Sequence, residues 1–181
     1  MKNCRLCRLH KTRTNVVPGE GPINTKIMLV GEAPGFNEDK QGRPFVGAAG
    51  QLLTELLKLA GIERSSVYIT NVVKCRPPGN REPMTDEIDV CTKEYLEKQF
   101  AIIRPELVIS LGRISASELL GYPVSISKEH GKIVRCKYAG VDFKLFLSYH
   151  PAAGLYGAQI RSELEEDFKK LSKTLDKYLA V

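Results

Sequence analysis

The sequence predicts an α/β fold of three layers, α/β/α, in which helices cover both faces of a central, mostly parallel four-stranded sheet. Two observations support this prediction. Four short apolar runs each stop at a glycine or a polar residue, and stretches with the apolar spacing of helices separate these runs. Strands that alternate with helices form parallel sheets, because the connecting helices pack on the faces. The 181 residues suffice for one substantial core, so we expect a single domain over residues 1–181.

The first strand is expected over residues 26–30 and opens into a turn, residues 31–35, which holds the carboxylate of Glu32. The turn has the pattern Gly-x-x-Pro-Gly, which continues neither a helix nor a strand. An irregular arm over residues 1–22 precedes this strand. A charged loop follows the turn, and a helix with four leucines on one face is expected over about residues 50–60.

The rest of the chain repeats this alternation. The expected elements are a strand over 67–73, a loop over 74–81, a long helix over about 85–103, a strand over 107–111 and a short helix over about 114–120. A hairpin over 132–147 follows, and its second arm is the fourth core strand. An amphipathic helix that carries apolar residues from Ile160 to Tyr178 closes the chain.

Positive charge is concentrated in the first half of the chain. Residues 1–81 carry 13 Lys and Arg against 6 Asp and Glu, whereas residues 82–181 carry 14 against 15. This bias suits a polyanionic partner, because Lys and Arg release counterions from phosphates, although general solubility explains the charge equally well. No apolar signal segment opens the chain and no run approaches the ~18 apolar residues of a membrane span, so we expect a soluble, cytoplasmic protein.

Five cysteines favour metal or cluster binding over disulfides, because an intracellular chain keeps its thiols reduced and an odd number leaves one unpaired. Cys4 and Cys7 have the spacing that lets two thiolates bind one metal centre, and Cys75 and Cys91 are candidates for two further ligands. By count, zinc explains these cysteines as well as a cluster does, and a buried structural Cys91 is the plain alternative. Cys136, in the hairpin, is expected in the core.

Three polar side chains from distant parts of the sequence lie at or near the ends of predicted strands. We expect Glu32, Asn71 and His150 to meet, because the carboxyl ends of parallel strands share one edge of the sheet, where ligands bind. Taken singly, each has an ordinary explanation: a loop carboxylate, a strand-end cap and a satisfied histidine. For His10 and His130 we retain that explanation. The expected convergence favours a binding site for the other three.

Phe45 and the loop over residues 74–81 are further candidates. A phenylalanine is more often part of the core, but Phe45 can also offer a face on which a base stacks. The loop combines Lys74, Arg76 and Arg81 with two prolines and a glycine. A solvated loop is its plain interpretation, and a clamp for phosphates is the functional one.

Several longer motifs are also present. They are Cys-x-x-Cys at 4–7, Gly-Glu-Ala-Pro-Gly at 31–35, Gly-Arg-Pro-Phe-Val-Gly-Ala-Ala-Gly at 42–50, Thr-Asn-Val-Val-Lys-Cys-Arg-Pro-Pro-Gly-Asn-Arg at 70–81, Cys91, and His-Pro-Ala-Ala at 150–153. Together they resemble the family 4 uracil-DNA glycosylases, the iron–sulfur type of bacteria and archaea, over nearly the whole chain. The resemblance implies an α/β/α fold and hydrolysis of the N-glycosidic bond of deoxyuridine, which releases uracil and leaves an abasic site without a lyase step.

The resemblance also implies a structural [4Fe-4S] cluster, rather than zinc, on Cys4, Cys7, Cys75 and Cys91. Such a cluster would tie the N-terminal arm to the loop and helix after the second strand. The implied partners are uracil-containing single- or double-stranded DNA and free uracil as product. A monomer is the default.

The roles of the converging residues follow from the same resemblance. Glu32 would hold or deprotonate the attacking water and stabilise the oxocarbenium-like sugar. His150 would donate a hydrogen bond to uracil O2 as negative charge builds there. Asn71 would bind the N3–H and O4 edge, and Phe45 would stack on the base once it has left the duplex.

Further residues take positions around this site by resemblance. Ala33, Pro34 and Gly35 would line the pocket, and Glu38 would crowd the C5 face of the base, where thymine carries a methyl group. The residues expected on DNA are Lys74, Arg76, Arg81 and Leu155. Leu155 is the expected wedge in the vacated space, in a segment that departs from the Ser-Pro form of the better-known relatives.

Two other functions remain open at this point. One is a non-catalytic nucleic-acid-binding module held together by a metal, which would explain the basic half and the cysteines but not the three converging side chains. The other is a related glycosylase that acts on another deaminated base. Relatives of that kind generally lack the polar residue at the position of Glu32.

Overall fold

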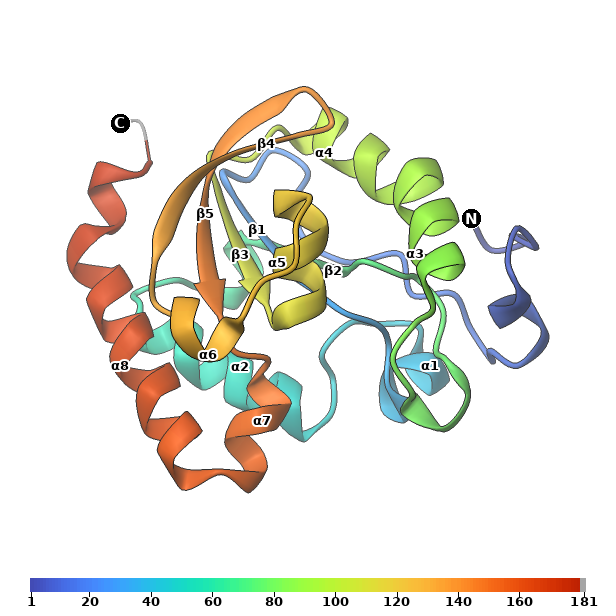
Figure 1. Ribbon diagram of the computed structural model, residues 1–181, viewed down its shortest axis with the longest axis horizontal. Coiled ribbons are helices and arrows are strands. Elements are labelled where there is room, and N and C mark those ends of the chain that lie inside the picture. Colours follow the sequence, from blue (N-terminus) through green and yellow to red (C-terminus); the bar gives the residue numbers. More distant parts are fainter. Residues whose placement is uncertain (180–181) are drawn as a thin grey trace.

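A five-stranded sheet with helices on both faces forms the centre of the computed structural model, which describes residues 1–179 (Figure 1). Its strands, in spatial order, are β2 (Tyr68–Asn71), β1 (Ile27–Gly31), β3 (Leu107–Leu111), β5 (Val141–Ser148) and β4 (Ile133–Tyr138). The first four are parallel, whereas β4 is antiparallel to β5. The predicted three-layer α/β/α fold is confirmed. The predicted number of four strands is wrong by one, because both arms of the hairpin join the sheet.

The helices follow the predicted order with three additions. They are α1 (Phe36–Gln41), α2 (Ala48–Leu59), α3 (Thr85–Cys91), α4 (Glu97–Ile103), α5 (Arg113–Leu120), α6 (Ile126–Glu129), α7 (Pro151–Tyr156) and α8 (Ala158–Thr174). A π-helical turn, Thr92–Leu96, joins α3 to α4, so the long helix predicted over 85–103 is continuous. The short helices α1, α6 and α7 lie in segments where no helix was predicted. None of the described helices is long and apolar enough to cross a membrane.

Both faces of the sheet are covered, which explains the uninterrupted apolar runs of its central strands. Every residue of β1 and β3 is buried. On one face, Met28 and Val108 pack with residues of α3, α4 and α5. On the other, Leu29 and Ile109 pack with α2 and α8. The last helix ends at Thr174, so the prediction that it includes Tyr178 is wrong.

The N-terminal arm is attached to the domain by hydrogen bonds to a buried carboxylate. Asp39 of α1 is 4% exposed and accepts hydrogen bonds from the backbone N–H groups of Thr14 (2.8 Å) and Asn15 (3.1 Å). The segment of Asp39 was predicted as a charged loop. Its backbone instead forms a helix that ends at Gln41 and is followed by Gly42, in the left-handed conformation that glycine adopts without strain.

The carboxyl ends of β1, β2 and β5 lie at one edge of the sheet. Gly31 and Asn71 are register partners, and the N–H of Gly112 donates to the carbonyl of Ser148 over 2.9 Å. Glu32 directly follows the end of β1, and His150 lies two residues after the end of β5. The chain connectivity therefore brings the three predicted polar residues together.

Candidate active site

An open cavity of about 380 Å³ lies at the carboxyl edge of the sheet. Its lining includes all eight residues that were predicted to contact the base or the water, namely Glu32, Ala33, Pro34, Gly35, Glu38, Phe45, Asn71 and His150. The predicted DNA contact Arg81 also lines the cavity, whereas Arg113, two residues after the end of β3, does not. A cavity of this size that combines apolar walls with a few polar groups is suited to a small planar ligand.

Asn71 presents an unpaired acceptor in this cavity. Among the residues that the structure describes, Oδ1 of Asn71 is the only buried side-chain nitrogen or oxygen atom without a hydrogen-bond partner. An unpaired buried acceptor costs about 1–3 kcal/mol, and a ligand donor would recover this. The neighbouring strand makes room for it, since a Cβ on Gly31 would lie 2.4 Å from Oδ1 and 2.7 Å from the ring of Phe45. Only glycine fits at this position.

His150 lies at the N-terminus of α7, where the helix fixes its ring. The backbone N–H of Ala152 donates to Nδ1 of His150 over 3.1 Å, so Nδ1 is an acceptor and Nε2 carries the proton. Burial lowers the pKa of His150 to about 4, and the charge of Glu38 opposes this only in part. His150 is therefore a neutral hydrogen-bond donor at neutral pH. Its ring stacks with that of Phe45, with centroids 5.7 Å apart.

The two carboxylates in the cavity have different surroundings. Burial raises the pKa of Glu32; the nearby charge of Glu82 raises it further, whereas Arg113 lowers it. Glu38 instead accepts hydrogen bonds, each of 3.1 Å, from the backbone N–H groups of Gly35, Val46 and Gly47. Glu38 thus joins two loops of the cavity wall, while Glu32 is the carboxylate with the raised proton affinity.

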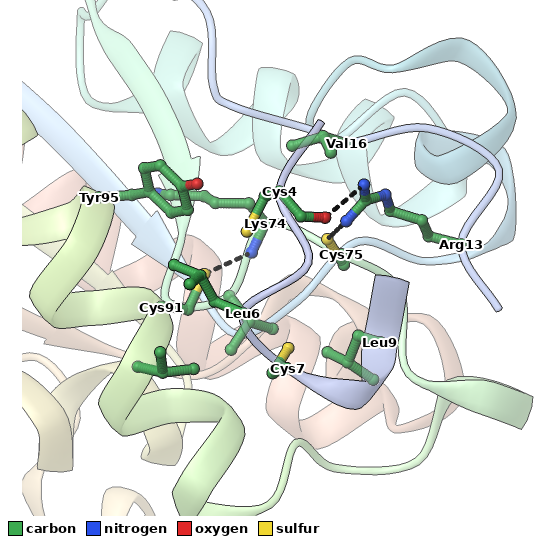
Figure 2. Close-up of a pocket in the computed structure, with 12 residues that line it drawn as sticks. Cys4, Leu6, Cys7, Leu9, Arg13, Val16, Lys74, Cys75, Cys91 and Tyr95 are labelled. Carbon is green, nitrogen blue, oxygen red and sulfur yellow. Dashed lines mark hydrogen bonds between the residues drawn. The ribbon is translucent and has the colours of Figure 1, made fainter. Parts of the chain in front are cut away.

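A second, smaller cavity brings together the four cysteines that were predicted as ligands (Figure 2). Cys4 and Cys7 come from the arm, Cys75 from the loop after β2, and Cys91 from α3. The fifth cysteine lies apart, since the thiol of Cys136 donates to the carbonyl of Leu119 over 3.1 Å, as expected for a core residue.

Four thiols line one apolar space in this cavity, which is a donor set that suits a metal centre. Among the side chains that the structure describes, no three Cys, His, Asp or Glu are placed to hold a single ion. Two N–H donors point at sulfur, Nη1 of Arg13 toward Cys75 (3.3 Å) and the backbone N–H of Lys74 toward Cys91 (3.4 Å). Burial raises the pKa of Cys91 to about 11, and the charge of Lys74 and that of any bound cation oppose this shift.

Comparison with known proteins identifies the family. Residues 18–175 match the family model of the Uracil DNA glycosylase superfamily. The chain is 52% identical to the type-4 uracil-DNA glycosylase of Sulfurisphaera tokodaii, over 93% of this chain and 79% of that protein. The identity is 48% to the type-4 enzyme of Archaeoglobus fulgidus (97% and 89% covered) and 44% to that of Thermotoga maritima (98% and 92%). The chain belongs to the type-4 uracil-DNA glycosylases. The resemblance drawn from the motifs is confirmed.

One residue predicted to contact DNA in this type-4 chain is buried. Lys74 is 1% exposed, and its Nζ donates to Oγ1 of Thr70 (2.6 Å), the carbonyl of Asn71 (2.7 Å) and Oε1 of Gln99 (2.6 Å). The prediction that Lys74 contacts DNA is therefore wrong. β2 ends at Asn71, but the chain stays inside the domain as far as Cys75, so Lys74 points inward and supports the strand end that carries Asn71.

The other residues predicted on DNA lie at the surface of the type-4 domain. The guanidinium of Arg76 lies 5.3 Å from the ring centroid of the exposed Phe36, and Arg81 forms a double hydrogen bond with Glu87 (2.9 and 2.7 Å). Leu155, at the end of α7, is 38% exposed, and its neighbour Tyr156 is 92% exposed. Their contacts with DNA stay predictions.

Four residues of the cavity were not predicted from the sequence. They are Ala49, Pro77, Asn80 and Ala152. All four stand inside motifs that were recognised: Ala49 in the motif at 42–50, Pro77 and Asn80 in the motif at 70–81, and Ala152 in the motif at 150–153. The signal for Ala152 was its place two residues after His150, where the first turn of a helix brings its N–H back to the imidazole.

Proposed function

We propose that the chain removes uracil from DNA by hydrolysing the bond between N1 of uracil and C1′ of deoxyribose, which leaves an abasic site. The observation that carries this proposal is the single cavity that holds Glu32, Asn71, His150 and Phe45. Membership of the type-4 family supports it independently. A non-catalytic binding module does not require a carboxylate of raised pKa and a neutral imidazole in the same cavity.

Asn71 supplies recognition of the base in this proposal. Its amide offers an acceptor for N3–H of uracil and a donor for O4, side by side. The unpaired Oδ1 supports the first of these contacts. Cytosine has an acceptor at N3 and an amino group at C4, so both contacts would be mismatched. Selection against cytosine therefore rests on the amide.

His150 and Glu32 act on opposite charges of the transition state. As the bond breaks, negative charge builds on the base and positive charge on the sugar. Nε2–H of a neutral His150 donates to O2 of uracil, which stabilises the departing anion. The carboxylate of Glu32, once ionised, stabilises the sugar cation and orients or deprotonates the attacking water. Neither role requires His150 to be charged.

The base reaches the cavity only after leaving the stack, at a cost of a few kcal/mol that is smallest for a mismatched base or a single strand. Phe45 then stacks on the flipped ring, and Leu155 fills the space that the base vacates. The backbone from Ala33 to Gly35 lines the pocket, and Glu38 narrows its C5 side. Arg76 and Arg81 contact the phosphates. The substrates are thus single- and double-stranded DNA that contains uracil, and the protein acts as a monomer.

Cys4, Cys7, Cys75 and Cys91 hold a [4Fe-4S] cluster in this proposal. Four thiols around one apolar space and two N–H donors toward sulfur support it. When bound, the cluster supplies a covalent link between the arm, the loop after β2 and α3, and no redox step. By fixing Cys75, it also fixes the start of the loop that carries Arg76 and Arg81.

A related glycosylase for another deaminated base is the second candidate. The contact of His150 with O2 favours uracil, because hypoxanthine has a hydrogen at C2 in place of this acceptor and its ring system is larger. The amide of Asn71 does not separate the two bases, since N1–H and O6 of hypoxanthine match N3–H and O4 of uracil. Comparing base release from otherwise identical oligonucleotides with uracil, hypoxanthine or thymine decides between them. We expect release from uracil to be fastest by at least about a hundredfold.

The decisive experiment is incubation with a labelled uracil-containing oligonucleotide, followed by alkali, which cleaves abasic sites. Strand breakage is expected, with uracil recovered as the free base. Glu32→Ala and His150→Ala should lose about 10²–10⁴-fold in rate while keeping the wild-type thermal midpoint within a few degrees. No breakage by the wild-type protein would exclude the glycosylase, and near-native rates in both variants would exclude the assigned roles.

A further inference from the structure

We propose that Arg64, which lies outside the cavity, is a positioning residue for uracil binding. Its guanidinium holds the backbone of the Phe45 segment, residues 44–47, and thereby sets the orientation of the phenyl ring toward the base. This inference rests on the proposed function, in which Phe45 stacks on uracil. It concerns a residue that belongs to none of the motifs singled out in the sequence and does not line the pocket.

Phe45 adopts a backbone conformation that a phenylalanine does not choose by itself. Its φ is +50°, in the left-handed region that residues with a Cβ rarely occupy. The following turn is crowded as well, since a Cβ on Gly50 would lie 1.8 Å from the carbonyl oxygen of Phe45. The left-handed conformation therefore needs external support.

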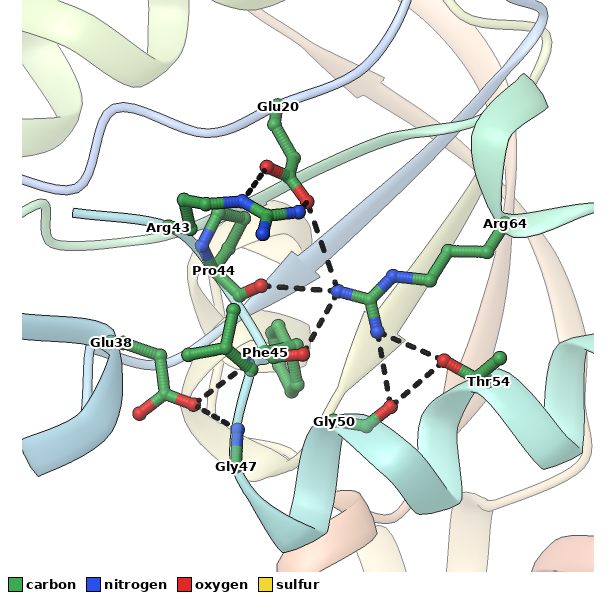
Figure 3. A network of polar contacts seen from close by, with 10 residues as sticks. Glu20, Glu38, Arg43, Pro44, Phe45, Gly47, Gly50, Thr54 and Arg64 are labelled. Carbon is green, nitrogen blue, oxygen red and sulfur yellow. Dashed lines mark hydrogen bonds and ion pairs between the residues drawn. The ribbon is translucent and has the colours of Figure 1, made fainter. Parts of the chain in front are cut away.

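Arg64 gives that support from one side. Its Nη2 donates to the carbonyls of Pro44 (3.1 Å) and Phe45 (2.9 Å), and its Nη1 donates to the carbonyl of Gly50 (3.0 Å) and to Oγ1 of Thr54 (3.0 Å). Figure 3 shows the planar guanidinium facing these oxygens from the direction of the turn Arg64–Ser66, just before β2. One side chain thus fixes both peptide carbonyls at the bend.

Glu38 holds the same segment from the other side. Its Oε1 accepts hydrogen bonds from the N–H groups of Val46 and Gly47, both at 3.1 Å (Figure 3). The carbonyls before the bend are thus paired with a cation and the N–H groups after it with an anion. Glu38 lines the cavity, so its replacement would alter the pocket directly. Arg64 does not line the cavity, so replacing Arg64 removes the support of the backbone of this segment without changing the lining of the pocket.

The neighbouring Arg43 provides a matched control. Its guanidinium forms two hydrogen bonds with Glu20, of 2.8 and 3.1 Å. The same carboxylate lies 4.0 Å from Nη2 of Arg64. Replacing Arg43 removes a positive charge from the same surface and frees the same glutamate. It leaves the hydrogen bonds of Arg64 to Pro44, Phe45 and Gly50 in place.

The test is a double-mutant cycle between Arg64 and Phe45, read out as single-turnover excision of uracil from a U·G duplex. Arg64→Met should lower the maximal rate about tenfold, whereas Arg43→Met should stay within about twofold of wild type. Because Arg64 acts through Phe45, the variant with both Arg64→Met and Phe45→Ala should be no slower than Phe45→Ala alone. Affinity for a duplex with a tetrahydrofuran abasic site, which has no base, should change by less than about twofold in Arg64→Met.

Two results would overturn the inference: an Arg64→Met rate within about twofold of wild type, or rate losses of the two single variants that multiply in the double variant. If Arg64→Met does not fold, Arg64→Lys serves in its place. A lysine keeps the charge and the stem but cannot span three carbonyls, so it should also be slower than Arg43→Met. An inactive wild-type protein would instead contradict the proposed function.

Discussion

The backbone N–H of Ala152 donates to Nδ1 of His150, which makes Nε2 the only ring nitrogen that carries a proton. Burial of the ring disfavours a positive charge and lowers the pKa of His150 to about 4, although the charge of Glu38 opposes this in part. His150 is therefore a hydrogen-bond donor that stays neutral, rather than an acid that titrates near pH 7.

The pH dependence of excision should follow Glu32. Burial raises the pKa of Glu32 above its ordinary value, and the ionised form is the active one. The rate should thus fall as the pH drops through this raised pKa and become independent of pH well above it. Single-turnover rates measured over pH 4.5–9 test this. The Glu32→Gln variant is the control, because it should lose the decline of the rate at low pH. A change of the excision rate near pH 6.5 that is absent from the His150→Asn variant would show that the imidazole becomes charged in this range instead.

Replacing the amide of Asn71 by a carboxylate should weaken uracil recognition selectively. An aspartate has no donor for O4 and places negative charge beside it, so Asn71→Asp should lose about 10–100-fold on uracil, since a good pair contributes about 1–3 kcal/mol. The amino group of cytosine can donate to that carboxylate. We therefore expect the ratio of uracil to cytosine excision to fall as well. An unchanged ratio would contradict the assignment of Asn71 to this edge of the base.

The cysteine cavity predicts a coloured protein. Protein purified without oxygen should be brown, with broad absorbance at the blue end of the visible spectrum, and should contain iron and sulfide. Cys75→Ser should lose the colour, whereas Cys136→Ser should keep it, because the thiol of Cys136 binds the carbonyl of Leu119 instead. Stoichiometric zinc without iron in such a preparation would contradict the cluster.

The buried position of Lys74 predicts how DNA binding depends on salt. Each phosphate contact adds roughly one unit to the slope of log K against log[salt]. Arg76→Ala should reduce this slope by about one, whereas Lys74→Met should leave the slope unchanged. Lys74→Met should instead lower the thermal midpoint, because three buried acceptors lose their donor. An equal change of slope in both variants would restore the earlier prediction for Lys74.

The end of α7 predicts a difference between duplex and single-stranded substrates. A wedge matters only where a flipped base leaves a gap in a stack, so Leu155→Ala should slow excision from a duplex about tenfold and change the single-strand rate by less than about twofold. The neighbouring Tyr156 is 92% exposed and is the matched comparison. If Tyr156→Ala alone shows the selective loss, the tyrosine is the wedge and the assignment of Leu155 is wrong.

Much of the fold and the site was predictable because the relevant signals are local. Short buried strands that end at Gly31, Asn71 and Ser148 are visible as apolar runs that stop at small or polar residues. Once the strands are known to be parallel, the meeting of Glu32, Asn71 and His150 follows from topology. The spacing of Cys4 and Cys7 is equally local.

The missed features depend on contacts between distant segments. Lys74 stands in a basic loop, and nothing nearby in the sequence shows that Thr70, Asn71 and Gln99 surround its ammonium group. Arg64 binds backbone carbonyls, which every residue has, so no side-chain pattern marks its partners. The helix α1 lacks a side-chain N-cap and is held by its tertiary contacts through Asp39.

The four thiols of the cysteine cavity all lie within the first 91 residues, whereas His150 follows the last strand of the sheet. A chain emerging from the ribosome exposes every proposed iron ligand before β3 and β5 have been made. The four proposed ligands of the cluster are therefore synthesised before His150, so a fragment that already contains all of them still lacks part of the excision pocket.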